Sequence, residues 1–328
     1  MNKQDDTTLL KPRGYRRILS AGFHLYTGYF RRFFKASWQM ALLYAIACGL
    51  SGTLTTIKLP EITLAIMNQM AAYQGIMVET LKEYAFTILE IVGLLLLALA
   101  TLALASAPII AKLKEHKETN IISIPPHWLS ASPAMMGRSL KALFLTILVM
   151  VIPLVLFLVV IYATETVSPH FVANHWITCM ASFIICTILA ILLLQPLFYV
   201  QMKYLMESTA SYWKTLAKGY AAGMHHWGTL FLVFFVSGMF VTLVGLVIMM
   251  PSYILNFANQ EAQRGLLMGD PLGMPSHMPY LTFITYLACN FMQFYVNQII
   301  LVHSYYLYGS IETKEKEKNQ LNEDRTIN

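Results

Sequence analysis

Six apolar runs, each about as long as a bilayer is thick, constrain this chain more than any other feature. A helix needs about 20 residues to cross about 30 Å of hydrocarbon, and each run meets or nearly meets that length. Only one charged residue, Glu90, lies inside a run, and none of the runs shows the period-2 alternation of a membrane barrel. The sequence therefore predicts an all-α, polytopic membrane bundle of six transmembrane helices. The predicted spans are 39–57, 84–111, 142–164, 177–200, 228–254 and 280–307.

The charge distribution indicates a lipid environment. Charged residues make up 12% of the chain, about half of the 25% typical of soluble domains. The net charge of +6 is spread over short segments beside the apolar runs, whereas a DNA-binding protein gathers its Lys and Arg on one soluble face. Anionic lipid headgroups attract such segments. We expect membrane lipids as partners, other membrane proteins as further candidates, and no nucleic acid.

The positions of the basic residues predict the orientation of the spans. Lys and Arg number 23. All but three lie in the N-terminal segment, the second and fourth connections and the C-terminal tail; the exceptions are Lys58, Lys82 and Arg264. Basic connections stay in the cytoplasm, and the first 38 residues lack the apolar stretch of a signal peptide. Both ends of the chain are therefore expected in the cytoplasm.

Residues 15–37 combine a basic polar stripe with an aromatic face. Polar side chains recur there every three or four residues, as on one face of a helix, and this composition is typical of an amphipathic helix lying in the headgroup plane. The stripe consists of Arg17, Ser20, His24, Thr27, Arg31 and Lys35, against Ile18, Leu25, Tyr26, Tyr29, Phe30 and Phe33. A similar lead-in to the fifth span contains Tyr212, Trp213, Lys214, Lys218 and Tyr220.

The domain organisation follows from these patterns. Residues 1–14 are predicted to be a polar N-terminal tail. Residues 15–310 are predicted to form the membrane domain, beginning with the interfacial amphipathic helix. Residues 311–328 alternate Glu with Lys, which is typical of a solvated, disordered end.

The most informative polar feature lies in the sixth predicted span. Five polar side chains there fall within about 60° of one another at 100° per residue: Tyr286, Asn290, Gln293, Asn297 and Ser304. Glu90 of the second span is expected at the same depth as Tyr286, so we group it with them as a candidate intramembrane site. Two interpretations remain open. Amides can join neighbouring helices by hydrogen bonds, or the stripe can line a polar path.

Prolines within three predicted spans allow two interpretations of those helices. Pro153, Pro196 and Pro251 interrupt the third, fourth and fifth spans. Bilayer helices tolerate such prolines as simple kinks when neighbours satisfy the freed carbonyls. Broken helices around a substrate site are the sharper alternative.

Motifs for catalysis or metal binding do not emerge. No P-loop, Rossmann glycine pattern or HExxH is present, and among the histidines only the adjacent pair His225-His226 approaches the spacing of a membrane iron oxygenase. Gly49-Leu50-Ser51-Gly52 spells the GxSG of rhomboid proteases. Ser51 and the candidate base His303 are expected at different depths, which argues against their pairing. We expect no catalytic residue, no metal site and no cofactor.

Two stretches beside predicted spans carry a family resemblance. They are Phe33-Phe34-Lys35-Ala36-Ser37-Trp38 before the first span and His226-Trp227-Gly228-Thr229-Leu230-Phe231 at the fifth. Together with the six-span layout they resemble the YciC-like bacterial membrane proteins and the membrane domain attached to some glycerophosphodiester phosphodiesterases. The resemblance implies a fold and a bacterial inner-membrane location, and it implies no reaction.

The sequence thus favours a non-enzymatic accessory or scaffold protein of the membrane. This hypothesis rests on the absent motifs and the short connections. A carrier for a lipid-like or small polar solute is the alternative, because of the polar stripe and the three prolines. A histidine-metal membrane oxygenase is the remaining alternative.

Overall fold

The computed structural model describes residues 8–71, 84–124, 132–167, 175–267, 269 and 275–327. These residues form seven helices, which confirms the all-α prediction. The helices are α1 (Tyr15–Ala71), α3 (Ala85–Thr119), α4 (Pro133–Val167), α5 (His175–Met206), α6 (Tyr212–His225), α7 (Trp227–Leu267) and α8 (Met278–Ile327).

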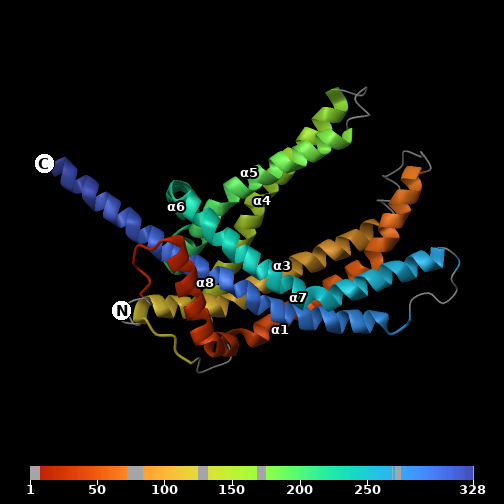
Figure 1. Ribbon diagram of the computed structural model, residues 1–328, viewed down its shortest axis with the longest axis horizontal. Helices are drawn as coiled ribbons and strands as arrows, with labels where there is room; N and C mark the ends of the chain where they lie inside the picture. Colours follow the sequence, from red (N-terminus) through yellow and green to blue (C-terminus); the bar gives the residue numbers. More distant parts are fainter. Residues whose placement is uncertain are drawn as a thin grey trace.

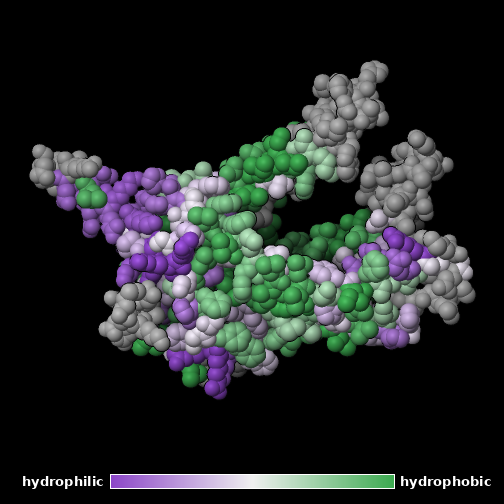
Figure 2. Space-filling view, viewed as in Figure 1, coloured by the Kyte–Doolittle hydropathy of each residue, from purple (hydrophilic) through white to green (hydrophobic). Residues whose placement is uncertain are grey.

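Four helical segments of the described part are long and apolar enough to cross a membrane by length and composition. They are Tyr15–Thr63, Ala85–Thr119, Phe183–Met206 and Trp227–Gly265. Large apolar side chains stay exposed on them; Val247, for example, is 72% exposed. Figure 2 shows the resulting apolar belt across the middle of the molecule, with hydrophilic residues gathered toward the end of α8. Soluble monomers rarely expose a continuous apolar surface of this extent, and such a belt is compatible with lipid as the solvent.

Helix α8 is the central element of the bundle. Helices α1 and α7 pack along it, and α3 packs on α1. Helices α4 and α5 form a hairpin that diverges from these four helices, and α6 packs on α5. The start of α1 and the end of α8 lie on the same side in Figure 1. We call this side, where α1 begins and α8 ends, the terminal end, and the side where α8 begins the distal end.

Helix α1 unites two elements that the sequence analysis separates. The predicted interfacial helix and the first predicted span are continuous within its 57 residues. Figure 1 shows that α1 turns sharply after its first part. In that part all six residues of the polar stripe are exposed, while Ile18, Leu25, Tyr26 and Phe33 are buried. The Tyr26 hydroxyl donates to the Tyr295 carbonyl of α8 at 2.6 Å, so the first part of α1 is packed on the bundle.

The C-terminal tail differs from the disordered end expected after residue 310. Helix α8 continues without interruption to Ile327 and projects from the bundle in Figure 1. Two features account for the helix. Residues such as Glu and Lys favour helices, and opposite charges three or four positions apart support them. In addition, Glu312 forms an ion pair with Lys203 of α5 at 2.6 Å, which fixes the first turn of the extension.

The described end of the predicted N-terminal tail packs against α8. Residues 1–7 lie outside the described part. Arg13 is buried, and its backbone N–H donates to the Ser310 hydroxyl at 2.9 Å. Its guanidinium lies over the Tyr306 ring, 5.1 Å from the ring centre. The end of the predicted tail is therefore held against α8, because a buried guanidinium and amide need such partners.

Candidate functional site

The polar stripe of the sixth predicted span lies on α8 at its contacts with α1 and α7. The Tyr286 hydroxyl is 3.1 Å from the hydroxyl of Thr56 on α1. Gln293 donates to Asn297 at 2.9 Å. The Gln293 amide rests on Gly245 of α7, where an added Cβ would lie 3.0 Å from its Nε2 atom. The stripe therefore faces neighbouring helices at close approach.

The remaining members of the predicted site divide into two groups. Asn290 donates to the Tyr286 carbonyl at 2.8 Å, and Ser304 donates to the Ile300 carbonyl at 2.7 Å, so both bond within α8. Glu90 is exposed on α3. Among the described residues no hydrogen bond or ion pair joins Glu90 to α8. The structure thus groups the five α8 residues on one helix and leaves Glu90 apart from them.

Pro60 removes one backbone hydrogen bond from α1 near the distal end, and side chains of α7 supply donors there. Pro60 has no backbone N–H, so the Thr56 carbonyl one turn earlier loses its helical donor. The Asn259 amide donates to this Thr56 carbonyl, and the Gln263 amide donates to the adjacent Ile57 carbonyl at 2.8 Å. In an apolar solvent the freed Thr56 carbonyl needs such a partner, and Gln263 adds a second bond from α7 to the same turn of α1. These two amides therefore join α7 to α1 where α1 is weakest.

Sequence reasoning overlooked this polar face of α7. Its residues recur at steps of four, three and four, the same periodicity that revealed the stripe on α8. They are Ser252, Asn256, Asn259 and Gln263. The search for polar residues at helical spacing that located the α8 stripe finds these residues too when it is applied to α7. Pro60 in α1 then indicates a carbonyl that needs a donor. The fifth span was assigned as ending at 254, so most of these residues fell outside it.

A polar cavity lies beside these bonds. It has a volume of about 230 Å³ and lies between α1, α7 and α8. Its walls are Thr55, Thr56, Leu59, Pro60, Thr63, Asn256, Gln260, Arg264 and Tyr286. Six of the nine wall residues carry a hydroxyl or amide group, although most of the wall surface is apolar. The one cation among the lining residues, Arg264, is exposed and paired with Glu261 at 2.8 Å. Such walls suit a small, uncharged polar molecule better than an ion.

A buried histidine joins three helices nearer the terminal end. His303 of α8 is 5% exposed, and its Nδ1 atom is 2.7 Å from the hydroxyl of Ser237 on α7. Gly22 of α1 packs so closely that an added Cβ would lie 2.3 Å from the His303 ring. Ser51, the serine of the GxSG motif, is buried elsewhere on α1. Ser237 is therefore the hydrogen-bond partner of His303.

The terminal end is held by a network of aromatic and ionic side chains. Glu312 of α8 accepts hydrogen bonds from the Tyr199 hydroxyl at 2.5 Å and from the Lys203 ammonium at 2.6 Å, both on α5. Lys117 of α3 donates to the Tyr308 hydroxyl at 3.1 Å. These contacts join α3, α5 and α8. Charge-assisted bonds of this kind are stronger than neutral ones, so this end is the more firmly cross-linked one.

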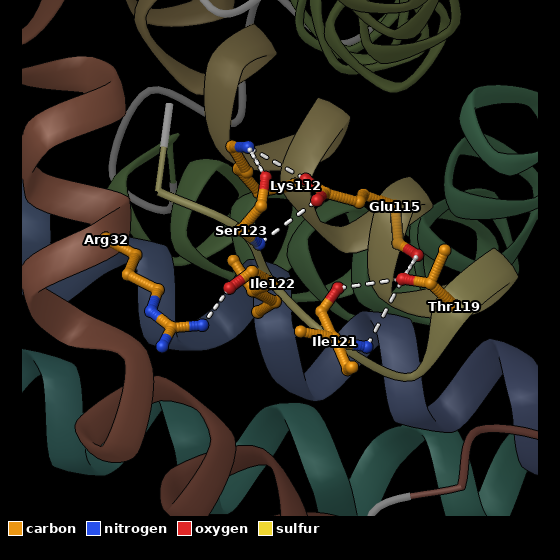
Figure 3. Close-up of polar contacts among 7 residues, drawn as sticks. All are labelled: Arg32, Lys112, Glu115, Thr119, Ile121, Ile122 and Ser123. Atoms are coloured by element: carbon orange, nitrogen blue, oxygen red, sulfur yellow. Dashed lines mark hydrogen bonds and ion pairs between the residues drawn. The ribbon is translucent and has the colours of Figure 1, made fainter. Parts of the chain in front are cut away.

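The segment after α3 is fixed to the first part of α1. Figure 3 shows the polar contacts that hold this segment to α3 and, through Arg32, to α1. Glu115 accepts the backbone N–H of Ser123 at 3.0 Å, and Lys112 donates to the carboxylate of Glu115 at 2.8 Å and to the Ser123 hydroxyl at 3.0 Å. Arg32 of α1 donates to the Ile122 carbonyl. The chain thus leaves α3 folded back over the terminal end.

His226, between α6 and α7, makes a further contact with α8. Its Nε2 atom is 2.9 Å from a carboxylate oxygen of Glu315. Burial lowers the pKa of His226, and the hydrogen bond and charge of Glu315 oppose this shift only in part. A neutral imidazole donating to the carboxylate is therefore the form that the fold favours near neutral pH.

His225 and His226 lie side by side where α6 meets α7. The rings of His225 and His226 are 5.1 Å apart at 75° to one another. Among the described residues no three His, Cys, Asp or Glu side chains come together in a group that can hold a metal ion.

Comparison of the chain with protein-family models, with curated proteins and with solved structures gives no match.

Proposed function

We propose that this chain is a bacterial inner-membrane protein that crosses the bilayer six times and acts as a non-enzymatic accessory or scaffold. Both chain ends lie in the cytoplasm, at the terminal end of the bundle. The apolar runs within α4 and α8 add two spans to the four helices that qualify by length and composition. The resemblance to YciC-like membrane proteins is part of the same proposal.

The orientation is supported by the basic residues and is tested by labelling. Single cysteines are introduced into a chain lacking its native ones and exposed to an impermeant reagent on whole cells. Labelling is expected near Gln74, Ser168 and Ser276. Protection is expected near Ser130, Ser211 and Asn319. One reversed connection contradicts the six-span topology.

The scaffold role rests on how the bundle uses its polar side chains. Tyr286 and Gln293 of the α8 stripe contact α1 and α7. The Asn259 amide replaces the hydrogen bond that Pro60 removes from α1, and the Gln263 amide donates to the next carbonyl. Interhelical bonds of this type hold membrane bundles together. The polar groups within the bundle thus serve assembly, and the cross-linked terminal end supplies a rigid surface.

Stability measurements test this use of the stripe. If Gln293 joins helices, Gln293→Leu lowers thermal stability in detergent by about 0.6 kcal/mol, the average for such bonds. Leu301→Ala on the same helix provides a reference for lost apolar packing. A Gln293→Leu protein with unchanged stability and reduced solute transport would contradict the scaffold proposal.

An accessory protein also requires a partner at a fixed ratio. The chain is extracted from native membranes directly into lipid nanodiscs and passed over a sizing column. The proposal expects one other membrane protein at constant stoichiometry. Purification through that protein should return the chain in the same ratio. A chain that elutes alone from native membranes contradicts the accessory role.

The polar cavity at the distal end favours a carrier as the second candidate. A carrier of a small polar solute needs a site bounded by movable helices, and this cavity of about 230 Å³ lies between α1, α7 and α8 beside Pro60. Tyr286→Phe removes one hydroxyl from its wall while keeping the ring. A carrier then loses uptake of labelled polyols or amino acids in liposomes, whereas a scaffold loses only the stability that the bond to Thr56 supplies. Equal uptake by both proteins and by empty liposomes rejects the carrier.

A further inference from the structure

Helix α6 has three distinct faces, and they divide its contacts. Along its 14 residues one face packs on α5. Gly219 and Gly223 lie on that face, and an added Cβ at Gly223 would lie 3.0 Å from Pro196. Tyr212 and Thr215 are buried on the same face. These small residues let α6 lie directly against α5.

The second face of α6 is apolar and forms one wall of a groove. The groove has a volume of about 410 Å³ and lies between α4, α5 and α6. Its walls are Val149, Ile152, Leu193, Leu194, Leu197, Leu216, Ala217 and Tyr220. Trp213 falls on the same helical face by spacing and is 57% exposed. The Tyr220 hydroxyl donates to the Leu193 carbonyl at 3.2 Å, so the polar atom of the wall is occupied and the groove is left hydrocarbon-like.

The third face of α6 is basic. Lys214, Lys218 and His225 follow one another at steps of four and seven residues, and all three are exposed. Within the described residues neither lysine ammonium takes part in a hydrogen bond or ion pair. Two free ammonium groups therefore lie on the helix that forms one wall of the apolar groove. A helix with these two faces belongs at the boundary between headgroups and acyl chains.

We propose that the α4–α5–α6 groove binds one anionic phospholipid of the leaflet at the terminal end. An acyl chain fills the groove, and Lys214 and Lys218 bind the phosphate and headgroup. The charge of the lysine pair selects an anionic lipid over a zwitterionic one. The apolar walls select a lipid over a soluble phosphate ester, because such an ester cannot occupy them.

Lipid titration with paired lysine variants tests the headgroup half of the site. The full-length protein in phosphatidylcholine nanodiscs is titrated with brominated phosphatidylglycerol, and quenching of tryptophan fluorescence is followed. The saturable component should require Trp213 and disappear in Trp213→Phe. In the double variant Lys214→Gln/Lys218→Gln the apparent affinity should be about thirtyfold weaker, or about 2 kcal/mol at 1.4 kcal/mol per factor of ten.

The control for charge is a second double variant. Lys316→Gln/Lys318→Gln on the exposed extension of α8 removes the same two charges. It should bind phosphatidylglycerol like the parent. Equal weakening in both double variants would mean that only the overall charge attracts the lipid, which overturns the proposed site.

A matched pair of alanine substitutions tests the groove. Ala217→Phe places a ring among the groove walls, whereas Ala221→Phe makes the same change one turn later on the basic flank. Saturable quenching should be lost in Ala217→Phe and kept in Ala221→Phe, with equal melting temperatures for the two. Binding that survives Ala217→Phe, or that glycerol phosphate abolishes by competition, overturns the assignment of an acyl chain to the groove.

Discussion

Asn259 of α7 donates its side-chain amide to the backbone carbonyl of Thr56 on α1, four residues before Pro60. The two residues are 203 positions apart in the chain. The bond replaces the helical hydrogen bond that proline cannot supply. A side chain of one helix thus completes the backbone of another.

This relationship predicts a dependence between two substitutions. Asn259→Leu should lower the free energy of unfolding by about 1–2 kcal/mol, because it leaves a buried carbonyl without a donor. In a Pro60→Ala background the restored N–H can serve the Thr56 carbonyl, and Asn259→Leu should then cost much less. Thermal unfolding of the four proteins in detergent measures the coupling. Gln260→Leu, at an exposed neighbouring position, should stay within about 0.5 kcal/mol of the parent. Equal costs of Asn259→Leu with and without Pro60 would show that the bond does not compensate for the proline.

The contact between Gly22 and His303 predicts a steric effect. Gly22→Ala should destabilise the protein by about 1–3 kcal/mol, because the new methyl group meets a ring that is itself enclosed. Gly28→Ala lies on the same part of α1 with nothing within 4 Å of its added Cβ. That change should be neutral or stabilising by about 0.5–1 kcal/mol. Circular dichroism melts of both variants provide the comparison, and a Gly22→Ala protein as stable as Gly28→Ala would refute the packing argument.

Glu312 is predicted to be the key residue for the extension of α8. Glu312→Gln removes the charge that Lys203 and the Tyr199 hydroxyl share. Because Tyr199 is buried and Lys203 is only partly exposed, the loss should be about 1–2 kcal/mol. Glu317→Gln, at an exposed position on the extension, should leave the melting temperature unchanged. Hydrogen exchange of the extension should rise only in Glu312→Gln, and similar exchange in both variants would show that the ion pair does not hold it.

The contact of His226 with Glu315 predicts a pH dependence. Burial lowers the pKa of His226, and nearby Lys314 and His225 lower it further, while Glu315 raises it. The folded-state pKa therefore lies below the value of about 6.5 for a free histidine. The unfolded chain then takes up the proton first, so this stability is present above about pH 6.5 and is lost as the pH falls through the folded pKa. Melting temperatures from about pH 7.5 to 5.5 should fall more in the parent than in His226→Gln. Parallel curves for the two proteins would contradict the shift.

The sequence identified those features that depend on local composition. Long apolar runs form helices in an apolar solvent because every backbone group must be paired within the segment. The periodicity of α8 identified Tyr286 and Gln293 as members of one face, and that face does meet neighbouring helices. The same reasoning did not find the ion pair of Glu312 with Lys203, because it joins segments remote in sequence.

Tertiary structure alone decided which helices the polar groups join. Local spacing shows that Asn259 and Gln263 share a face of α7, but only the packing of α7 on α1 brings them to the carbonyls before Pro60. Likewise, the sequence shows that α6 is basic and aromatic, but the groove beside it exists only where α6 lies against the α4–α5 hairpin. Periodicity is a property of one helix, whereas a hydrogen-bond partner or a cavity depends on the relative positions of several, which no single segment encodes.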